Sequence, residues 1–410
     1  MPWQPYHAVW ALLVFGWICN YVVRMAFSPL LEPVMAEFGL THAQGGFLFS
    51  VFFYGYIAMQ VPAGLLGDRF GRKRVLVIGI LLVAVAALVT GLSGTLAVLA
   101  LARLLTGLAQ GMYFANDRPI IAAATPPDRL ALGQGVSFSG LGIGTALGVL
   151  VGGALGEIMP WRQVFLLLMV LPLCSAALIG RFVSDPRKPG RGASGAHTAG
   201  AAVAAVFRLR DLWLLGIAGI SPIWTQWLVG TWGPALFAEV GVRELGRSAL
   251  YASVLGIAAP PGLLAVGALS DQLLWRWGTP RRTVVAGGIA ATALLAATMG
   301  WIVQAQGPPW LLALVMFATS FCFWGTWAPA YALTAELAPG GAMGAAFGVL
   351  NSVAFVSSLV APYVTGWIKD WSGSFAGACY LAALVGVVAV PVALRVGSPQ
   401  TGRGPATHRH

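Results

Sequence analysis

The sequence predicts an all-α membrane protein with twelve transmembrane helices in two pseudo-symmetric bundles of six, and with both chain ends in the cytoplasm. Composition is the first observation: 58% of the 410 residues are hydrophobic and only 9% are charged, whereas a soluble domain is about 25% charged. The second observation is that the apolar residues form runs long enough to cross a bilayer. The third is a charged motif that occurs once in each half of the chain.

Twelve apolar runs have the roughly 20 residues that a helix needs to cross a bilayer. The runs lie near residues 8–30, 43–64, 75–92, 96–122, 131–156, 162–181, 212–237, 248–270, 283–303, 309–335, 341–366 and 373–395. They divide the chain into an N-terminal bundle (1–181), a linker (182–211), a C-terminal bundle (212–395) and a tail (396–410). Near the end of the linker, residues 203–207 are expected to form a short interfacial helix.

Basic residues in the connecting segments indicate the orientation. If the N-terminus is cytoplasmic, 17 Lys and Arg residues fall on the cytoplasmic side and four on the outer side, as the positive-inside rule requires. The net charge of +11 is therefore interpreted as a topology signal beside anionic lipid. We expect no nucleic-acid partner.

The charged motif follows the second run and reads Gly-Leu-Leu-Gly-Asp-Arg-Phe-Gly-Arg-Lys-Arg, residues 64–74. It must lie outside the hydrocarbon, because each charge at the bilayer centre costs roughly 2.5–3.5 kcal/mol on insertion scales. A weaker copy, residues 267–282, occupies the corresponding place in the second half. Internal repeats of half the chain length are typical of transporters that bind substrate between two helical bundles.

The motif resembles the signature loop of the major facilitator superfamily, and the weaker copy lies where that family keeps one. The resemblance covers essentially the whole chain. It implies the twelve-helix, two-bundle fold, alternating access without an ATP site, and a role of the loop in conformational switching. The expected switch residues are Gly64, Asp68, Arg69, Gly71, Arg72, Arg103 and Asp271. Asp68 should pair with Arg72 or cap a neighbouring helix, unless it is a solvated loop charge.

Two further segments are similar to the anion:cation symporter branch, whose members carry organic acids such as aldonates and hexuronates. They are residues 20–24 in the first run and residues 114–118 in the fourth. The resemblance implies that Arg24 and Arg118 match the two anion-binding arginines of that branch. Val23 departs from it, because many members carry an acidic residue there. Either Asp117 takes this role in proton coupling, or the coupling of this chain differs from that of the branch.

Elementary chemistry supports a special role for Arg24 and Arg118. An arginine within an apolar run cannot lose its charge, so it must face a cavity, a partner or a substrate. Its planar guanidinium matches a carboxylate with two parallel hydrogen bonds. The alternative is a structural salt bridge. Because neighbours on a helix project about 100° apart, Asp117 and Arg118 are expected to find partners elsewhere, not each other; Asp117 is either the coupling group or an arginine's structural partner.

The second half offers aromatic and amide side chains in place of charge. Trp residues often belong to interfacial belts, which is the alternative to a role in the cavity. The candidate substrate-binding residues are Asn20, Tyr21, Arg24, Tyr54, Arg118, Gln226, Trp324, Trp327 and Asn351. Arg103 is expected to have a structural or gating role.

Together these features predict a secondary transporter that takes up a small organic anion, a carboxylate such as a sugar acid, with protons. It is expected to be a monomer that crosses the bacterial inner membrane many times, with no cofactor, no metal and no enzymatic activity. One alternative is an exporter or exchanger of a drug, siderophore or sugar. The glycine-rich fifth run lacks the Gly-Pro pair of drug:proton antiporters, which disfavours a drug exporter. Another alternative is a sensor or scaffold that does not transport.

Overall fold

The computed structural model describes residues 4–126, 129–185, 205–338 and 343–397, and these residues are nearly all helical. Within these ranges, 12 helices, some of them broken, are long and apolar enough to cross a membrane. The prediction of an all-α protein with twelve spans is confirmed. Most of the predicted linker and tail lies outside the described residues. The expected helix at 203–207 is described from residue 205, where a short helical turn runs to residue 208.

The first half contains α1 (Pro5–Met25), α2 (Phe27–Phe38), α3 (His42–Phe70), α4 (Arg72–Leu92), α5 (Leu96–Ala124), α6 (Leu130–Ile158), α7 (Trp161–Leu168) and α8 (Val170–Phe182). The second half contains α10 (Arg210–Glu239), α11 (Leu245–Ala252), α12 (Val254–Ile257), α13 (Ala259–Trp277), α14 (Arg281–Gln304), α15 (Pro309–Leu337), α16 (Met343–Ser372) and α17 (Ala376–Leu394).

Three spans are broken, and in each of them a proline accounts for one break. Proline has no backbone N–H and its ring collides with the carbonyl four residues earlier. Pro29 follows the break between α1 and α2, Pro172 follows the break between α7 and α8, and Pro260 follows the break between α12 and α13. Each pair or trio of helices therefore acts as one bent span.

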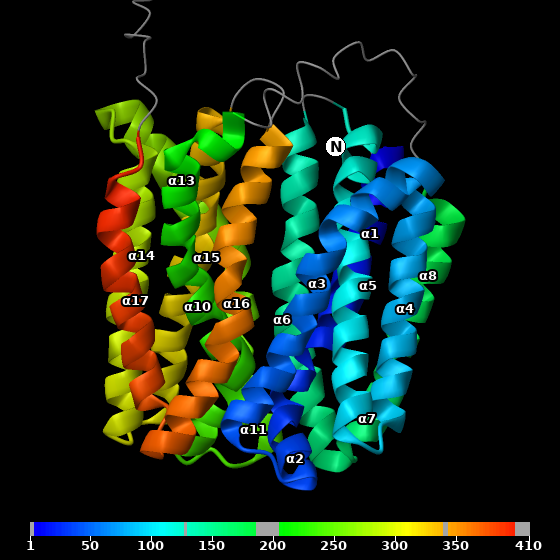
Figure 1. The fold of residues 1–410 in the computed structure, drawn as a ribbon, viewed down its shortest axis with the longest axis vertical. Helices are drawn as coiled ribbons and strands as arrows, with labels where there is room; N and C mark the ends of the chain where they lie inside the picture. The colour runs from blue at the N-terminus through cyan, green and yellow to red at the C-terminus, as the bar shows by residue number, and fades with distance from the viewer. Residues whose placement is uncertain (1–3, 127–128, 186–204, 339–342, 398–410) are drawn as a thin grey trace, which may run out of the picture.

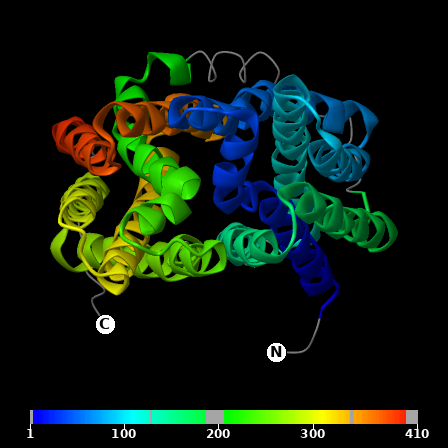
Figure 2. The same cartoon turned by 90° about the horizontal axis from the view of Figure 1, so that it is seen from below.

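The two halves stand side by side, as Figures 1 and 2 show from two directions. Helix α1 begins and α17 ends on the same face, which we call the terminal face (Figure 1). The charged motif joins α3 to α4 at this face, and its weaker copy joins α13 to α14 there. The prediction that this face is cytoplasmic remains a prediction.

Helices of the two halves pack together near the opposite face. There α3 packs on α16, and α6 packs on α11 and α12. The approach of α3 to α16 is close enough to require glycine. A Cβ on Gly46 would lie 2.1 Å from the Pro362 carbonyl oxygen, and one on Gly366 would lie 2.1 Å from the His42 carbonyl oxygen.

Polar contacts reinforce this packing. The Asp370 carboxylate of α16 accepts hydrogen bonds from the backbone N–H groups of His42 and Ala43, at 2.9 and 2.8 Å. These groups are the free donors at the first turn of α3, where the helix dipole favours an anion. We call the set His42, Gly46, Pro362, Gly366 and Asp370 the α3–α16 junction. It holds the halves together at the face opposite the chain ends.

Candidate functional site

A cavity of about 580 Å³ lies between the halves. Its walls come from α1, α3, α5 and α6 in the first half and from α10, α13, α15 and α16 in the second. Arg24, only 1% exposed, is part of its buried end. Leu132 and Gly135, both exposed, line it within the first two turns of α6, at the terminal face. The cavity therefore opens toward the terminal face, and the α3–α16 junction lies at the other one.

Arg24 lies in a cage of aromatic rings. Its Cζ is 4.0 Å from the centroid of Phe52, 4.5 Å from Trp227 and 5.0 Å from both Tyr21 and Phe53. Such cation–π contacts are worth about 0.5–2 kcal/mol, but they satisfy no N–H group. Nε and Nη2 are buried and have no hydrogen-bond partner among the described residues. These two nitrogens form the edge of a guanidinium that donates two parallel hydrogen bonds to a carboxylate.

Three tryptophans of the second half also line the cavity, and the indole N–H groups of two of them, Trp227 and Trp324, differ in their hydrogen bonding. Trp227 is 3% exposed, and its Nε1 is buried without a hydrogen-bond partner among the described residues. The Nε1 of Trp324 donates to the Leu255 carbonyl at 3.2 Å. A buried donor without a partner costs about 1–3 kcal/mol. Trp227 therefore adds an available donor beside Arg24, from the other half of the molecule.

Six of the nine predicted substrate-binding residues line the cavity, together with several residues outside that set. The six are Tyr21, Arg24, Gln226, Trp324, Trp327 and Asn351. The additional polar or aromatic residues of the wall include Tyr56, Gln60, Ser139, Trp227 and Tyr331. The Tyr331 hydroxyl donates to Asn351 Oδ1 at 3.2 Å, so these two second-half side chains form one polar group.

Three predicted residues lie elsewhere: Tyr54, Asn20 and Arg118, of which Arg118 is described with Asp117 below. Tyr54 is 46% exposed and does not line the cavity. It is two positions from Tyr56, which is about 200° around the helix, so it projects away when Tyr56 projects inward. Asn20 is buried between helices: its Nδ2 donates to the Gly16 carbonyl at 2.9 Å, and its backbone carbonyl accepts from Gln110 Nε2 of α5 at 2.8 Å. Asn20 therefore joins α1 to α5.

The expectation that Asp117 and Arg118 do not pair is wrong. Arg118 Nη2 lies 3.1 Å from Asp117 Oδ2. The arginine side chain is long enough to fold back over its own helix, so the 100° offset at Cα does not separate the charged ends. Trp17 donates to the same carboxylate oxygen at 2.8 Å, and Arg118 Nη1 donates to the Gln134 side chain at 2.9 Å.

This polar cluster lies behind the cavity wall. Neither Asp117 nor Arg118 is part of the lining. The Arg118 Cζ is 3.8 Å from the centroid of Phe138, a residue that does line the cavity. Asp117 Oδ1 is buried and has no hydrogen-bond partner among the described residues. The carboxylate thus keeps one free oxygen.

Arg103 is a second buried arginine, 2% exposed. Its Nε and Nη2 also have no partner among the described residues. The Cζ is 4.2 Å from the centroid of Phe27, 5.3 Å from Phe49 and 5.7 Å from Phe52. Arg103 does not line the cavity; it lies two turns from the start of α5 at the opposite face. It contributes positive charge beyond the closed end of the cavity.

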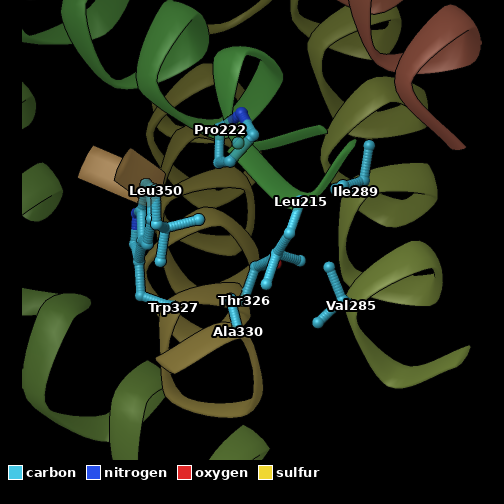
Figure 3. A pocket seen from close by; sticks show the side chains of 9 residues that line it. Leu215, Pro222, Val285, Ile289, Thr326, Trp327, Ala330 and Leu350 are labelled. Atoms are coloured by element: carbon cyan, nitrogen blue, oxygen red, sulfur yellow. The ribbon is translucent and has the colours of Figure 1, made fainter. Parts of the chain in front are cut away.

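A small pocket inside the second half is shown in Figure 3. Its volume is about 10 Å³, room for about one water molecule. Apolar side chains dominate its wall, and Trp327 belongs to both this pocket and the large cavity. The pocket is too small for a substrate, and it leaves space behind Trp327.

The charged motif is held on the first half at the terminal face. The predicted pairing of Asp68 with Arg72 is confirmed, with 2.5 Å between the charged atoms. Gly71 has φ +103°, a conformation that favours glycine, and Asp185 Oδ1 accepts from the Lys73 backbone N–H at 3.1 Å. Sequence reasoning missed Asp185, because it is distant from the motif along the chain.

The weaker copy of the motif also forms ion pairs. Arg281 lies 2.6 Å from Asp271 and 2.7 Å from Glu336 at the end of α15. Each copy thus fixes a short loop to its own bundle through an aspartate and an arginine. This shared arrangement supports the internal repeat inferred from the sequence.

Comparisons with known proteins agree with this geometry. The chain is 27% identical over 385 residues to a probable sulfoacetate transporter of Cupriavidus necator, covering 90% of this chain and 88% of the relative. It is 24% identical to a hexuronate transporter of Bacillus subtilis, covering 96% and 95%.

Solved structures show the same fold. A D-xylose–proton symporter superposes with a TM-score of 0.80 at 15% identity, covering 97% of this chain and 99% of that one. A bacterial homologue of the lysosomal transporter Spinster gives 0.78 at 16% identity, covering 96% and 97%. Residues 13–294 match the sequence profile described as Major Facilitator Superfamily. The chain is therefore a multi-pass membrane transporter, not an enzyme, and it belongs to the major facilitator superfamily.

Proposed function

We propose that this protein is a secondary transporter that moves a small organic anion, such as a sugar acid, in symport with protons. The observation that carries the proposal is the unpaired edge of Arg24 at the closed end of the cavity. An uncompensated buried charge costs several kcal/mol. A protein keeps such an unpaired charge where ligand binding requires it. A carboxylate or sulfonate is the chemical group that accepts hydrogen bonds from two parallel N–H donors.

The remaining contacts support a ligand held by both halves. Arg24 belongs to α1, and Trp227, whose Nε1 is also unpaired, belongs to α10. An anion bound to both would join the bundles, and alternating access requires that substrate binding be coupled to their relative movement. The names of two relatives, a probable sulfoacetate transporter and a hexuronate transporter, agree with an anionic substrate.

Proton coupling is assigned to Asp117. It is the buried carboxylate next to the cavity wall, and Oδ1 is free to carry a proton. Protonation would remove the charge that pairs with Arg118 and would release the guanidinium from one of its partners. Arg118 is thereby proposed as a second anion contact that becomes available during the cycle. The switch residues of the charged motif would control the opening and closing of the terminal face during the same cycle.

The orientation follows from the charge distribution. The terminal face is proposed to be cytoplasmic, and the described conformation is then open to the cytoplasm of a bacterial cell. The protein is proposed to work as a monomer, because the cavity is formed by one chain. No cofactor is required, since the proton gradient supplies the driving force.

Purified protein reconstituted in liposomes tests the proposal. Uptake of radiolabelled gluconate, glucuronate and sulfoacetate is measured with and without an imposed pH gradient, together with neutral sugars and lipophilic drugs. The expected result is uptake of at least one anion, stimulated by the gradient and abolished in Arg24→Ala. Arg247→Ala is the matched control, because Arg247 lies in an exposed ion pair with Glu244 worth about 0–1 kcal/mol.

Transport of neutral sugars or drugs alone, or full anion uptake by Arg24→Ala, would contradict an Arg24-centred anion site. Anion uptake that ignores the pH gradient and persists in Asp117→Asn would retain the anion site and remove proton symport. Folding of each variant is checked by its melting temperature and elution profile.

A further inference from the structure

The cavity contains one charge. Of the described residues that line it, only Arg24 has a side chain that is charged at neutral pH. Asp117 and Arg118 lie behind the wall and neutralise each other. While Asp117 is ionised and paired with Arg118, the bound anion thus meets a single positive group at one end and neutral walls everywhere else.

The wall beyond Arg24 has a consistent chemical character. Tyr331 and Asn351 form a hydrogen-bonded pair, and Gln226, Gln60 and Ser139 offer further neutral donors and acceptors. Aromatic rings and aliphatic side chains make up the rest of the wall. Amides and hydroxyls suit hydroxyl groups of a ligand, and flat rings suit its C–H faces. Neither compensates a full negative charge.

Arg103 does not change this balance. Its guanidinium is 2% exposed and is absent from the lining. It lies toward the opposite face, beyond Phe52, whereas the cavity extends from Arg24 toward the terminal face. Its charge therefore strengthens the attraction on the group that Arg24 binds. A second anionic group, at the other end of a ligand, would lie farther from both arginines.

We infer that the site selects monoanions: molecules with one carboxylate or sulfonate and a neutral, hydroxyl-bearing body. This inference rests on the proposed function, because it assumes that the ligand's anionic group binds Arg24. A second carboxylate in the cavity would lose its water without gaining a cation, and burial of an unpaired charge is strongly unfavourable. Dianions of the same shape are therefore rejected. Sulfoacetate carries both a carboxylate and a sulfonate, so this selectivity would distinguish the chain from its relative named for sulfoacetate transport.

Pairs of ligands that differ by one carboxylate test the inference. Gluconate and glucarate share the same carbon chain, but glucarate replaces the terminal CH₂OH with a second carboxylate. Propionate with succinate, and methanesulfonate with sulfoacetate, form further pairs. Binding of each compound to the purified full chain is measured by thermal shift and by isothermal titration calorimetry at neutral pH. The expected result is a dissociation constant at least about 100-fold larger for the dianion in every pair that binds.

A gain-of-function variant adds an independent readout. Asn351→Lys places a cation on the second-half wall, and Asn351→Gln is the neutral control of similar length. The Lys variant should improve glucarate binding relative to gluconate by about tenfold or more, and the Gln variant should not change that ratio. If the Lys variant does not fold, the comparison of ligand pairs on the wild-type protein still tests the inference.

Three outcomes of the wild-type measurement are distinguishable. Binding of monoanions with rejection of their dianionic partners supports the inference. Equal or tighter binding of dianions overturns it, and leaves the proposed anion transport intact as long as binding requires Arg24. Binding of no anion from any pair overturns the proposed function and the inference together.

Discussion

The α3–α16 junction gives a prediction whose size follows from the structure. In Gly366→Ala, the new Cβ would lie 2.1 Å from the His42 carbonyl oxygen, and real Cβ atoms are essentially never closer than 3.0 Å to such an atom. The obstacle is backbone, so no side chain can rotate away. Helices α3 and α16 must therefore separate, and the arrangement closed at the opposite face must weaken.

The expected cost is about 1–3 kcal/mol, which is typical of overpacking. Because each 1.4 kcal/mol changes an equilibrium constant tenfold, the population closed at the opposite face should fall about 5- to 150-fold relative to the population open there. Gly348→Ala is the matched control. Gly348 lies in the same helix with nothing within 4 Å of the added Cβ, so both variants gain the same helix propensity and differ only in the collision.

Pulsed electron–electron double resonance measures the result. Spin labels are placed at Ala36 on α2 and Trp371 on α16, exposed residues near the opposite face in the two halves, in a chain whose native cysteines are replaced. The distance distribution should gain a longer component in Gly366→Ala and remain unchanged in Gly348→Ala. Identical distributions in the two variants would refute the idea that this glycine contact closes the junction.

Three further predictions concern single side chains. Trp227→Phe keeps an aromatic ring and removes the unpaired N–H, so anion affinity measured by calorimetry should fall about 10- to 100-fold, the worth of a charge-assisted hydrogen bond. Trp324→Phe is the control: the N–H of Trp324 already has a carbonyl partner, so this variant should bind the anion within about threefold of the wild type. Asp117→Asn should exchange substrate across liposome membranes but fail to accumulate it against a gradient under an imposed pH difference. Asp68→Asn breaks the exposed pair with Arg72, so stability should change by no more than about 1 kcal/mol while the transport rate falls at unchanged affinity; an unchanged rate would contradict a switch role.

The spans could be predicted from the sequence because the bilayer imposes a simple rule. Every backbone polar group in hydrocarbon must be satisfied within a helix, so a run of about 20 apolar residues has one stable form. The same rule made Arg24 conspicuous, because a permanent charge in such a run needs a special environment. The twelve spans and the buried end of the cavity were therefore within reach of sequence reasoning.

Side-chain direction was harder to predict. Tyr54 and Tyr56 are equally plausible wall residues by composition, yet only Tyr56 faces the cavity. Helical spacing offered a signal: Phe52, Tyr56 and Gln60 recur every four residues, so they share one face of α3, and Phe52 and Tyr56 both lie near Arg24. Once Phe52 or Gln60 is known to face the cavity, this spacing predicts that Tyr56, and not Tyr54, faces it too.

The partners of the buried arginines could not be predicted. Arg118 has Asp117 and Gln134 as partners, whereas the guanidinium edge of Arg103 has none among the described residues. From the sequence the two arginines look alike, since each lies within an apolar run of α5. Their difference depends on which residues of α1 and α6 reach them in the folded chain.

The central claim is that Arg24 is held unpaired for the substrate's anion, and its most direct test is the melting temperature of Arg24→Met with and without ligand. Methionine fills a similar space without a charge, so the variant no longer buries an uncompensated guanidinium. We predict that it melts at or above the wild-type temperature without ligand, and that gluconate does not shift it. In the wild type, gluconate at 100 times its dissociation constant should add about 2.7 kcal/mol of stability. A variant that melts well below the wild type, or that gluconate still stabilises, would contradict the claim.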